Sequence, residues 1–359
     1  MTDTFEVTSA PALVEPISSV LDEVAMAAKN HQDRVRIPSE FASLGLAPEL
    51  LQAVADLGFT QPTTVQLKTI PLALPSDNAD TKKGFIDLMV SSQTGSGKTA
   101  AFLLPVIHTL LKQISEAQTA ERVAFEKSVA QAIAKGEEPP KKPKRKNPTN
   151  TRNFKAPSPG ALIVCPTREL AQQVAHDAID LVKHCRGLRV ANVVGGIPYQ
   201  LQIAKLQNAN LVVATPGRLL DLQRSMQIKL DKVQFLVVDE ADRMLDLGFQ
   251  EDIEAIHELA AGRSQTLMFS ATFAPRIMEL ASNLMNNPES IELASAQDKH
   301  ENIAQTLHWA DGVALKHQLL NHWLSDPSME QAVVFASTQV DSEMIADNLR
   351  AQGHSATAL

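Results

Sequence analysis

The stretch SQTGSGKT, Ser92–Thr99, decides the fold of this 359-residue chain. It follows Ile86–Val90, a short apolar run that is broken only by Asp87, and it precedes Ala100–Leu104, which begins a helix. The glycines let the backbone turn its N–H groups inward, and the positive N-terminal end of the helix faces the same point. The segment therefore predicts a buried strand, an anion-binding loop and a helix in succession.

The loop carries the residue types that bind a nucleoside triphosphate. We expect Lys98 to reach the β- and γ-phosphates and the Thr99 hydroxyl to ligate Mg²⁺. Ser92 stands where the general pattern G-x-x-x-x-G-K-[ST] has its first glycine. The phosphate cradle is then expected to comprise Thr94, Gly95, Ser96, Gly97, Lys98 and Thr99.

A second chemical segment is the acidic tetrad that begins at Asp239 and Glu240 and ends at Asp242. It follows the apolar run Gln234–Val238, which reads as another buried strand. Carboxylates at the carboxyl end of a parallel strand lie at the crevice where such sheets bind ligands. We expect Asp239 to hold Mg²⁺ through water, and Glu240 to orient and deprotonate the attacking water.

Between residues 38 and about 297, apolar runs alternate with amphipathic stretches, which predicts an α/β protein with a parallel sheet flanked by helices. The predicted strands are Ile86–Val90, Ala161–Cys165, Arg189–Val194, Leu211–Ala214, Phe235–Val238 and Thr266–Phe269. After a polar stretch, Gln305–Leu359 begins a second α/β unit. Its expected elements are the helix Lys316–Leu324, the strand Ala332–Phe335 and the helix Ser342–Gln352.

The chain resembles the DEAD-box ATP-dependent RNA helicases of bacterial type. The resemblance rests on motifs that occur in the family's order from Phe41 to near the C-terminus: GFTQPTTVQ at Gly58–Gln66, PTRELA at Pro166–Ala171, the pair Gly195-Gly196, TPGR at Thr215–Arg218, SAT at Ser270–Thr272 and VVFASTQ at Val333–Gln339. It implies a RecA-like P-loop domain followed by the beginning of a second RecA-like domain, and it implies that the chain is truncated within the second.

The same resemblance assigns roles to residues. The adenine of ATP is expected to stack on Phe41, and its polar edge is expected to hydrogen-bond to Gln66. Each residue also has a purely structural interpretation: Phe41 could be a core residue, and Gln66 could be a helix-surface residue. The residues expected to grip RNA are Pro166, Thr167, Arg168, Gly196, Thr215, Gly217 and Arg218. Those expected to couple nucleotide state to domain closure are Asp242, Ser270 and Thr272.

The domain division that we expect has five parts: an N-terminal extension at 1–37, an ATP-binding domain at 38–297, a basic insertion within it at about 113–158, a linker at 298–304 and a partial domain at 305–359. Lys135–Pro157 is rich in Lys, Arg and Pro and poor in apolar residues, a composition that does not bury enough surface to fold. It is either a solvated loop or a basic tether for RNA.

Composition narrows the remaining choices. The net charge of −8 argues against an indiscriminate polyanion binder, but it allows a local RNA groove. No apolar run approaches the roughly 18 residues of a membrane span, so we expect no membrane contact. Two cysteines suggest neither a disulfide framework nor a zinc site, and they fit the reducing cytoplasm. We expect the protein to be a monomer. Two rival functions stay open: an RNA clamp without productive unwinding, and a P-loop ATPase that acts on DNA or protein.

Overall fold

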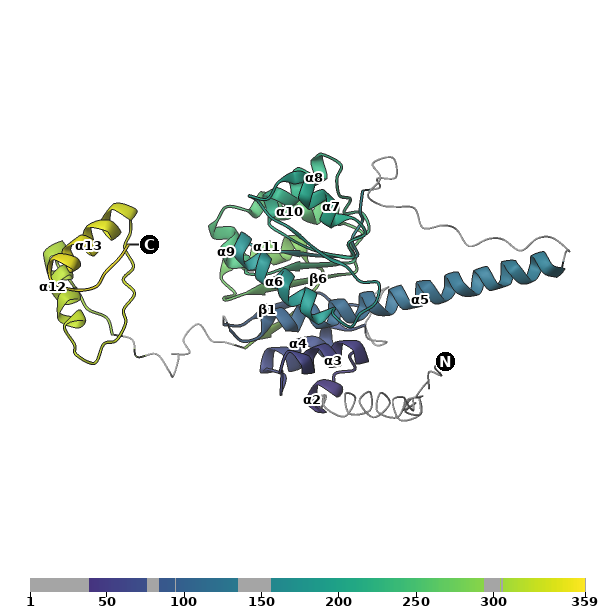
Figure 1. Ribbon diagram of the computed structural model, residues 1–359, viewed down its shortest axis with the longest axis horizontal. Helices are drawn as coiled ribbons and strands as arrows, with labels where there is room; N and C mark the ends of the chain where they lie inside the picture. Colours follow the sequence, from purple (N-terminus) through teal and green to yellow (C-terminus); the bar gives the residue numbers. More distant parts are fainter. Residues whose placement is uncertain are drawn as a thin grey trace, which may run out of the picture. The chain divides into compact units, whose positions relative to one another are not determined.

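The computed structural model describes residues 39–75, 84–93, 95–134, 156–293, 304 and 306–358. The chain divides into two compact units, Met1–Gln297 and Asp298–Leu359, and each is described by itself. The first unit contains a sheet that is flanked by helices (Figure 1). The expected extension at 1–37, Thr94 and the linker at 298–303 lie outside the described residues.

The sheet has seven strands in the order β3-β4-β2-β5-β6-β1-β7, and every paired strand is parallel to its neighbour. The strands are β1 (Leu88–Ser91), β2 (Ala161–Val164), β3 (Val190–Val193), β4 (Leu211–Ala214), β5 (Phe235–Val238), β6 (Gln265–Ser270) and β7 (Glu289–Glu292). This confirms the predicted parallel α/β fold, with the six expected strands found to within two residues at each end.

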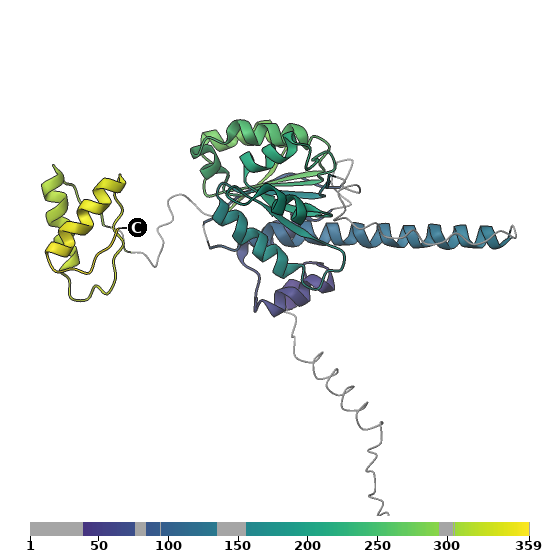
Figure 2. The same ribbon diagram turned by 45° about the horizontal axis from the view of Figure 1, so that its top comes forward.

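Helices cover both faces of the sheet (Figure 2). In the first unit these are α2 (Ser39–Ala42), α3 (Pro48–Asp56), α4 (Thr64–Ala73), α5 (Lys98–Ala134), α6 (Arg168–Leu181), α7 (Tyr199–Leu206), α8 (Pro216–Arg224), α9 (Ala241–Asp246), α10 (Gln250–Leu259) and α11 (Pro275–Leu284). Alternate residues of each strand enter opposite core layers, as Val90 and Met89 do. One layer includes residues of α3 to α6, and the other includes residues of α7 to α11.

Helix α5 corrects the expected start of the insertion. The helix is 37 residues long and continues to Ala134, so the first part of the stretch 113–158 is helical. Its sequence has no Gly or Pro after Pro105 and is rich in Ala, Glu, Gln and Lys, which are strong helix formers. The second half of α5 extends away from the sheet (Figure 1), and Val123 and Ile133 are exposed there. The basic residues 135–155 lie outside the described residues.

Strand β7 was not predicted from the sequence. Its segment, Glu-Ser-Ile-Glu, buries only Ile291, because it pairs with β1 alone at the edge of the sheet. A single buried side chain among polar neighbours gives no apolar run to detect.

The second unit contains α12 (Val313–Leu324) and α13 (Gln339–Ala351), which confirms the two expected helices with earlier starts. The expected strand Ala332–Phe335 is wrong, because these residues have no regular structure. In the described part of this unit no strand lies beside them, and Phe335 is 93% exposed. An apolar run forms a strand only where a neighbouring strand takes up its backbone hydrogen bonds.

Candidate nucleotide and RNA site

Six of the predicted motifs emerge at one edge of the sheet. The phosphate loop follows β1, the acidic tetrad follows β5, and the Ser-Ala-Thr segment begins at the end of β6. Because β5, β6 and β1 are neighbours, these three segments lie together. The other three motifs follow β2, β3 and β4, which form the opposite half of the same edge.

The phosphate loop is closed on itself in this structure. Lys98 is only 9% exposed, and its Nζ donates to the carbonyl oxygen of Ser92 at 3.0 Å. The Ser96 hydroxyl donates to that of Ser92 at 3.0 Å. Lys98 and Thr99 are the first residues of α5, so a phosphate that displaces the Ser92 carbonyl from Lys98 would face the helix N-terminus.

Gln66 links the loop to α4. Its Nε2 donates to the carbonyl oxygen of Gly97 at 3.1 Å, while its Oε1 accepts from the backbone N–H of Thr63 at 3.0 Å. Gly97 has φ +91°, a conformation that disfavours other residues, and a Cβ there would lie 2.6 Å from that Nε2, so glycine is favoured at position 97. The structure therefore brings Gln66 to the nucleotide loop, with its amide already bonded within the protein.

Phe41, which was expected to stack on adenine, is a core residue in the structure. Its ring is 0% exposed and belongs to the core, so it presents no face to a ligand. The ring stacks on Phe59 at a centroid distance of 6.4 Å, and Phe59 is 37% exposed. The accessible aromatic ring is therefore Phe59, which the sequence shows only as part of the GFTQPTTVQ motif.

Asp239 and Glu240 occupy different environments. Asp239 is 3% exposed, and burial raises the pKa of its carboxyl to about 6, while the nearby Lys98 ammonium opposes that rise. Glu240 is half-buried and adopts the left-handed conformation at φ 52°, which is strained for a residue with a side chain. Its Oε2 lies 3.4 Å from Nη1 of Arg243.

The expected coupling contact is present in altered form. The family resemblance implies that Ser270 and Thr272 hydrogen-bond toward the acidic tetrad, with Asp242 as their partner. Instead, its Oδ2 accepts from the backbone N–H of Ala271 at 3.2 Å. The Ser270 hydroxyl accepts from the N–H of Thr272 at 3.4 Å and so stabilises the turn itself. The acidic tetrad and the Ser-Ala-Thr segment are therefore joined by a hydrogen bond from the backbone of Ala271 to the side chain of Asp242.

The predicted RNA residues form the other half of the edge. Thr167 caps α6, its hydroxyl accepting from the N–H of Leu170 at 3.3 Å, and Pro166 precedes it. The guanidinium of Arg168 packs against Gly195 and Gly196.

The TPGR segment completes this half of the edge. Thr215, Gly217 and Arg218 start α8, and Nη1 of Arg218 donates to the carbonyl oxygen of Ile197 at 3.0 Å. The structure thus brings six of the seven predicted RNA residues to one stretch of surface at the ends of β2, β3 and β4, whereas Pro166 is buried beneath it.

Mg²⁺ fits this arrangement as a nucleotide-bound ion. The described residues hold no group of three or more His, Cys, Asp or Glu side chains suited to a metal. Mg²⁺ is usually held by one or two carboxylates together with phosphates and water, so the buried Asp239 carboxylate and the Thr99 hydroxyl are sufficient protein ligands.

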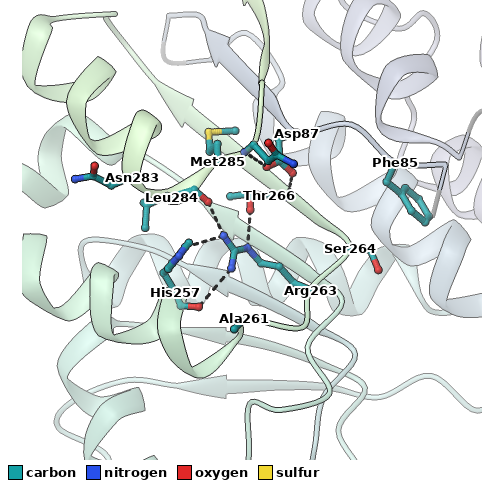
Figure 3. Close-up of a pocket in the computed structure, with 11 residues that line it drawn as sticks. Phe85, Asp87, His257, Ala261, Arg263, Ser264, Thr266, Asn283, Leu284 and Met285 are labelled. Carbon is teal, nitrogen blue, oxygen red and sulfur yellow. Dashed lines mark hydrogen bonds between the residues drawn. The ribbon is translucent and has the colours of Figure 1, made fainter. Parts of the chain in front are cut away.

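A cavity of about 410 Å³ lies at the opposite, amino-terminal edge of the sheet (Figure 3). Arg263 lines it, but its five N–H groups are all committed to protein acceptors: the Thr266 hydroxyl, Nδ1 of His257, and the carbonyl oxygens of His257, Ala260 and Leu284. Burial and the guanidinium lower the pKa of His257, which fits a neutral ring that accepts at Nδ1. Arg263 therefore joins the strand and the loops around the cavity, and its guanidinium is not free to bind a ligand there.

A parallel sheet with a phosphate loop, a carboxylate pair and a closed lysine at its carboxyl edge defines a P-loop nucleotide-binding protein of RecA-like type. The model of the DEAD/DEAH box helicase family matches residues 63–280. This chain therefore belongs to that family.

Named relatives agree. The chain is 34% identical to the ATP-dependent RNA helicase RhlB of Pseudomonas syringae pv. tomato, over 89% of this chain and 70% of that protein. It is 32% identical to SrmB of Haemophilus influenzae, over 88% and 61%, and 32% identical to DeaD of Escherichia coli K12, over 89% and 43%. The chain thus spans less than two thirds of the length of the last two.

Solved structures show the same fold. A DEAD box protein from Methanococcus jannaschii matches with a TM-score of 0.54 at 30% identity, over 89% of this chain and 72% of that one. Dbp5 of S. cerevisiae bound to RNA and ADP BeF3 matches with a TM-score of 0.63 at 27% identity, over 88% and 68%. None of the helices in the described part of the chain has the length and apolar character that crossing a membrane requires.

Proposed function

We propose that this chain binds ATP·Mg²⁺ and RNA as part of an ATP-dependent RNA helicase. One observation carries the proposal: the phosphate loop and acidic tetrad occupy one half of a single sheet edge, and the Arg168, Gly196 and Arg218 segments occupy the other half. Ligands at the two halves therefore contact one rigid sheet. The names of the relatives support the same activity.

On the nucleotide side, Lys98 exchanges its bond to the Ser92 carbonyl for the phosphates. Thr99 and Asp239 would hold Mg²⁺, which would supply positive charge beside the phosphates. Glu240 orients the attacking water and accepts its proton. Phe59 supplies the ring face for the adenine and Phe41 supports it from the core, whereas Gln66 reads the base after it releases Gly97.

On the RNA side, the grip comes from Thr and Arg side chains and from glycine backbone. Such groups bind phosphate and sugar and carry little sequence information, so we expect loose sequence preference. Contacts to the 2′-hydroxyl would favour RNA over DNA. The bond from Ala271 to Asp242 joins the segment after β6 to the acidic tetrad and is the coupling element that we propose.

We also place the protein in the cytoplasm as a monomer. The two cysteines, Cys165 and Cys185, are both buried free thiols, and burial raises the pKa of each. Buried thiols of this kind fit a reducing compartment.

The test measures ATP hydrolysis with no nucleic acid, with single-stranded RNA and with DNA of the same sequence, and it follows displacement of a short RNA duplex. RNA-stimulated hydrolysis with displacement supports the helicase. Stimulation without displacement indicates an RNA clamp, and equal stimulation by DNA indicates the third function.

Two variants tie the activity to the site. Lys98→Ala should abolish ATP binding, whereas Lys112→Ala, an exposed position on the same helix, should bind as the parent does. Glu240→Gln keeps ATP binding but lowers turnover by roughly 10²–10⁴-fold, since it removes the base. Parent-like turnover of Glu240→Gln would exclude that residue as the base.

A further inference from the structure

The loop that joins β3 to α7 contains Gly195 and Gly196 and contacts Arg168 and Arg218 of the other two RNA segments. We propose that Gln202 and Tyr199, both on α7, are positioning residues that preset this loop for RNA phosphates. The inference rests on the proposed function and deepens it, because it adds two residues that do not themselves touch RNA.

Gln202 closes the loop from inside. Its side chain is 0% exposed, and its Nε2 donates to the carbonyl oxygen of Val194 and, at 3.3 Å, to that of Ile197. These two carbonyls stand immediately before and after the glycine pair. One buried amide therefore fixes both ends of the loop and neutralises two oxygens that would repel a phosphate.

Gly195 and Gly196 pack closely against the guanidinium of Arg168. A Cβ on Gly195 would lie 3.0 Å from the Arg168 guanidinium, and one on Gly196 would lie 2.6 Å from its Nη1. Gly196 also has φ +81°, which disfavours any other residue. Among the described residues, no protein group accepts from the N–H of either glycine. These two donors are therefore available to a phosphate oxygen.

Tyr199 sets the third side of the loop through Arg218. The guanidinium carbon of Arg218 lies 4.3 Å from the centre of the Tyr199 ring, and the Tyr199 hydroxyl donates to Oδ2 of Asp221 at 3.2 Å. Held over the ring, Arg218 donates to the Ile197 carbonyl, the same oxygen that Gln202 binds. Tyr199 thus fixes the start of α7 against α8.

The main test compares RNA and ATP affinities of the 359-residue chain. RNA binding is followed by fluorescence anisotropy of a labelled single-stranded RNA with Mg²⁺ and a non-hydrolysable ATP analogue, and ATP affinity is titrated separately. Gln202→Met keeps the volume but removes the amide, and we expect its RNA dissociation constant to rise about tenfold, the effect of losing one net hydrogen bond. The ATP dissociation constant should stay within about twofold, because the phosphate loop lies at the other half of the edge.

Matched variants separate positioning from general damage. Gln200→Met changes an exposed residue of the same helix and should bind RNA as the parent does. Tyr199→Phe keeps the ring under Arg218 and should lose less RNA affinity than Tyr199→Leu. With saturating RNA, the turnover of each variant should return to the parent value, with only the KM for RNA raised. Hydrogen exchange in residues 194–199 should be faster in Gln202→Met.

The contrary results are distinct. Parent-like RNA affinity of both Gln202→Met and Tyr199→Leu would overturn this inference alone. An equal loss of ATP and RNA affinity would also overturn it, because that result shows a general structural role. If the parent chain itself fails to bind RNA, the proposed function falls and takes the inference with it.

Discussion

At the scale of single residues, the nucleotide half of the site pairs two buried groups of opposite charge. Lys98 is bonded to a carbonyl of its own loop, and Asp239 is a buried carboxyl with a raised pKa. Both groups are held in a state that a nucleotide and a cation would relieve. The residues are thus prepared for ligands at a cost in stability to the free protein.

That cost predicts a dependence of stability on pH. Between the ordinary pKa of 3.8 and the raised value of about 6, folded Asp239 retains a proton that the unfolded chain has lost. Stability of the metal-free protein should therefore fall as the pH rises through this window, by at most roughly 3 kcal/mol from this group. Asp239→Asn, which stays neutral, should flatten that part of the profile.

Urea unfolding in EDTA from pH 4 to pH 7.5 measures the effect. The difference in stability between Asp239→Asn and the parent should grow with pH and level off above about 6. A difference that is independent of pH would show that Asp239 has no raised pKa in the folded protein.

Single residues also show what the sequence alone can predict. The loop residues around Lys98 follow from local spacing, because a phosphate loop is one continuous segment. Gln202, Tyr199 and the exposed ring of Phe59 did not follow, since their roles depend on contacts between separate helices and loops. A buried glutamine on a helix gives no local pattern that would distinguish it from a surface glutamine.

At the scale of elements, prediction succeeded where burial is complete. Strands β2, β4 and β5 are buried at every residue, and each shows as a continuous apolar run. Strand β7 is buried at one residue and gave no signal, whereas Ala332–Phe335 gave a signal and is not a strand. Pairing with a neighbour decides both cases, and pairing is not written locally in the sequence.

Arg263 offers a test at this scale, because it joins α10, β6 and the end of α11 at the edge opposite the nucleotide. Arg263→Lys keeps the charge but has fewer donors in a different geometry, so some of the five acceptors lose their partner. We expect the free energy of unfolding to fall by about 1–3 kcal/mol with ATP affinity unchanged.

Chemical denaturation and nucleotide titration check these two expectations. Arg276→Lys, whose guanidinium pairs with Asp246 on the exposed surface, is the matched control and should change stability by less than about 0.5 kcal/mol. Equal stability of Arg263→Lys and the parent would mean that the cavity edge is not held by this side chain.

At the scale of the whole molecule, the net charge of −8 disfavours RNA binding, whereas the basic stretch Lys135–Pro157 would favour it. If the stretch is a tether, replacing Lys141, Lys142, Lys144, Arg145 and Lys146 by Gln should weaken RNA binding several-fold at low salt. The slope of log affinity against log salt should become shallower, because fewer counterions are released.

The control replaces Lys112, Arg122 and Lys127 of α5 by Gln. These substitutions remove positive charge outside the basic stretch. Anisotropy titrations at several salt concentrations compare the two sets. An unchanged slope in the basic-stretch variant would identify the stretch as a solvated loop without a role in RNA binding.

The division into two units predicts where each ligand is bound. Every nucleotide-contacting residue proposed here belongs to the unit that ends at Gln297. Residues 1–297 alone should therefore bind ATP within about threefold of the 359-residue chain, by calorimetric titration. RNA-stimulated turnover should fall much further, because a population shift toward a closed state requires a second unit that prefers it. Equal RNA stimulation in both chains would show that the first unit hydrolyses ATP without closure, and the coupling proposed for Asp242 would then act within one domain.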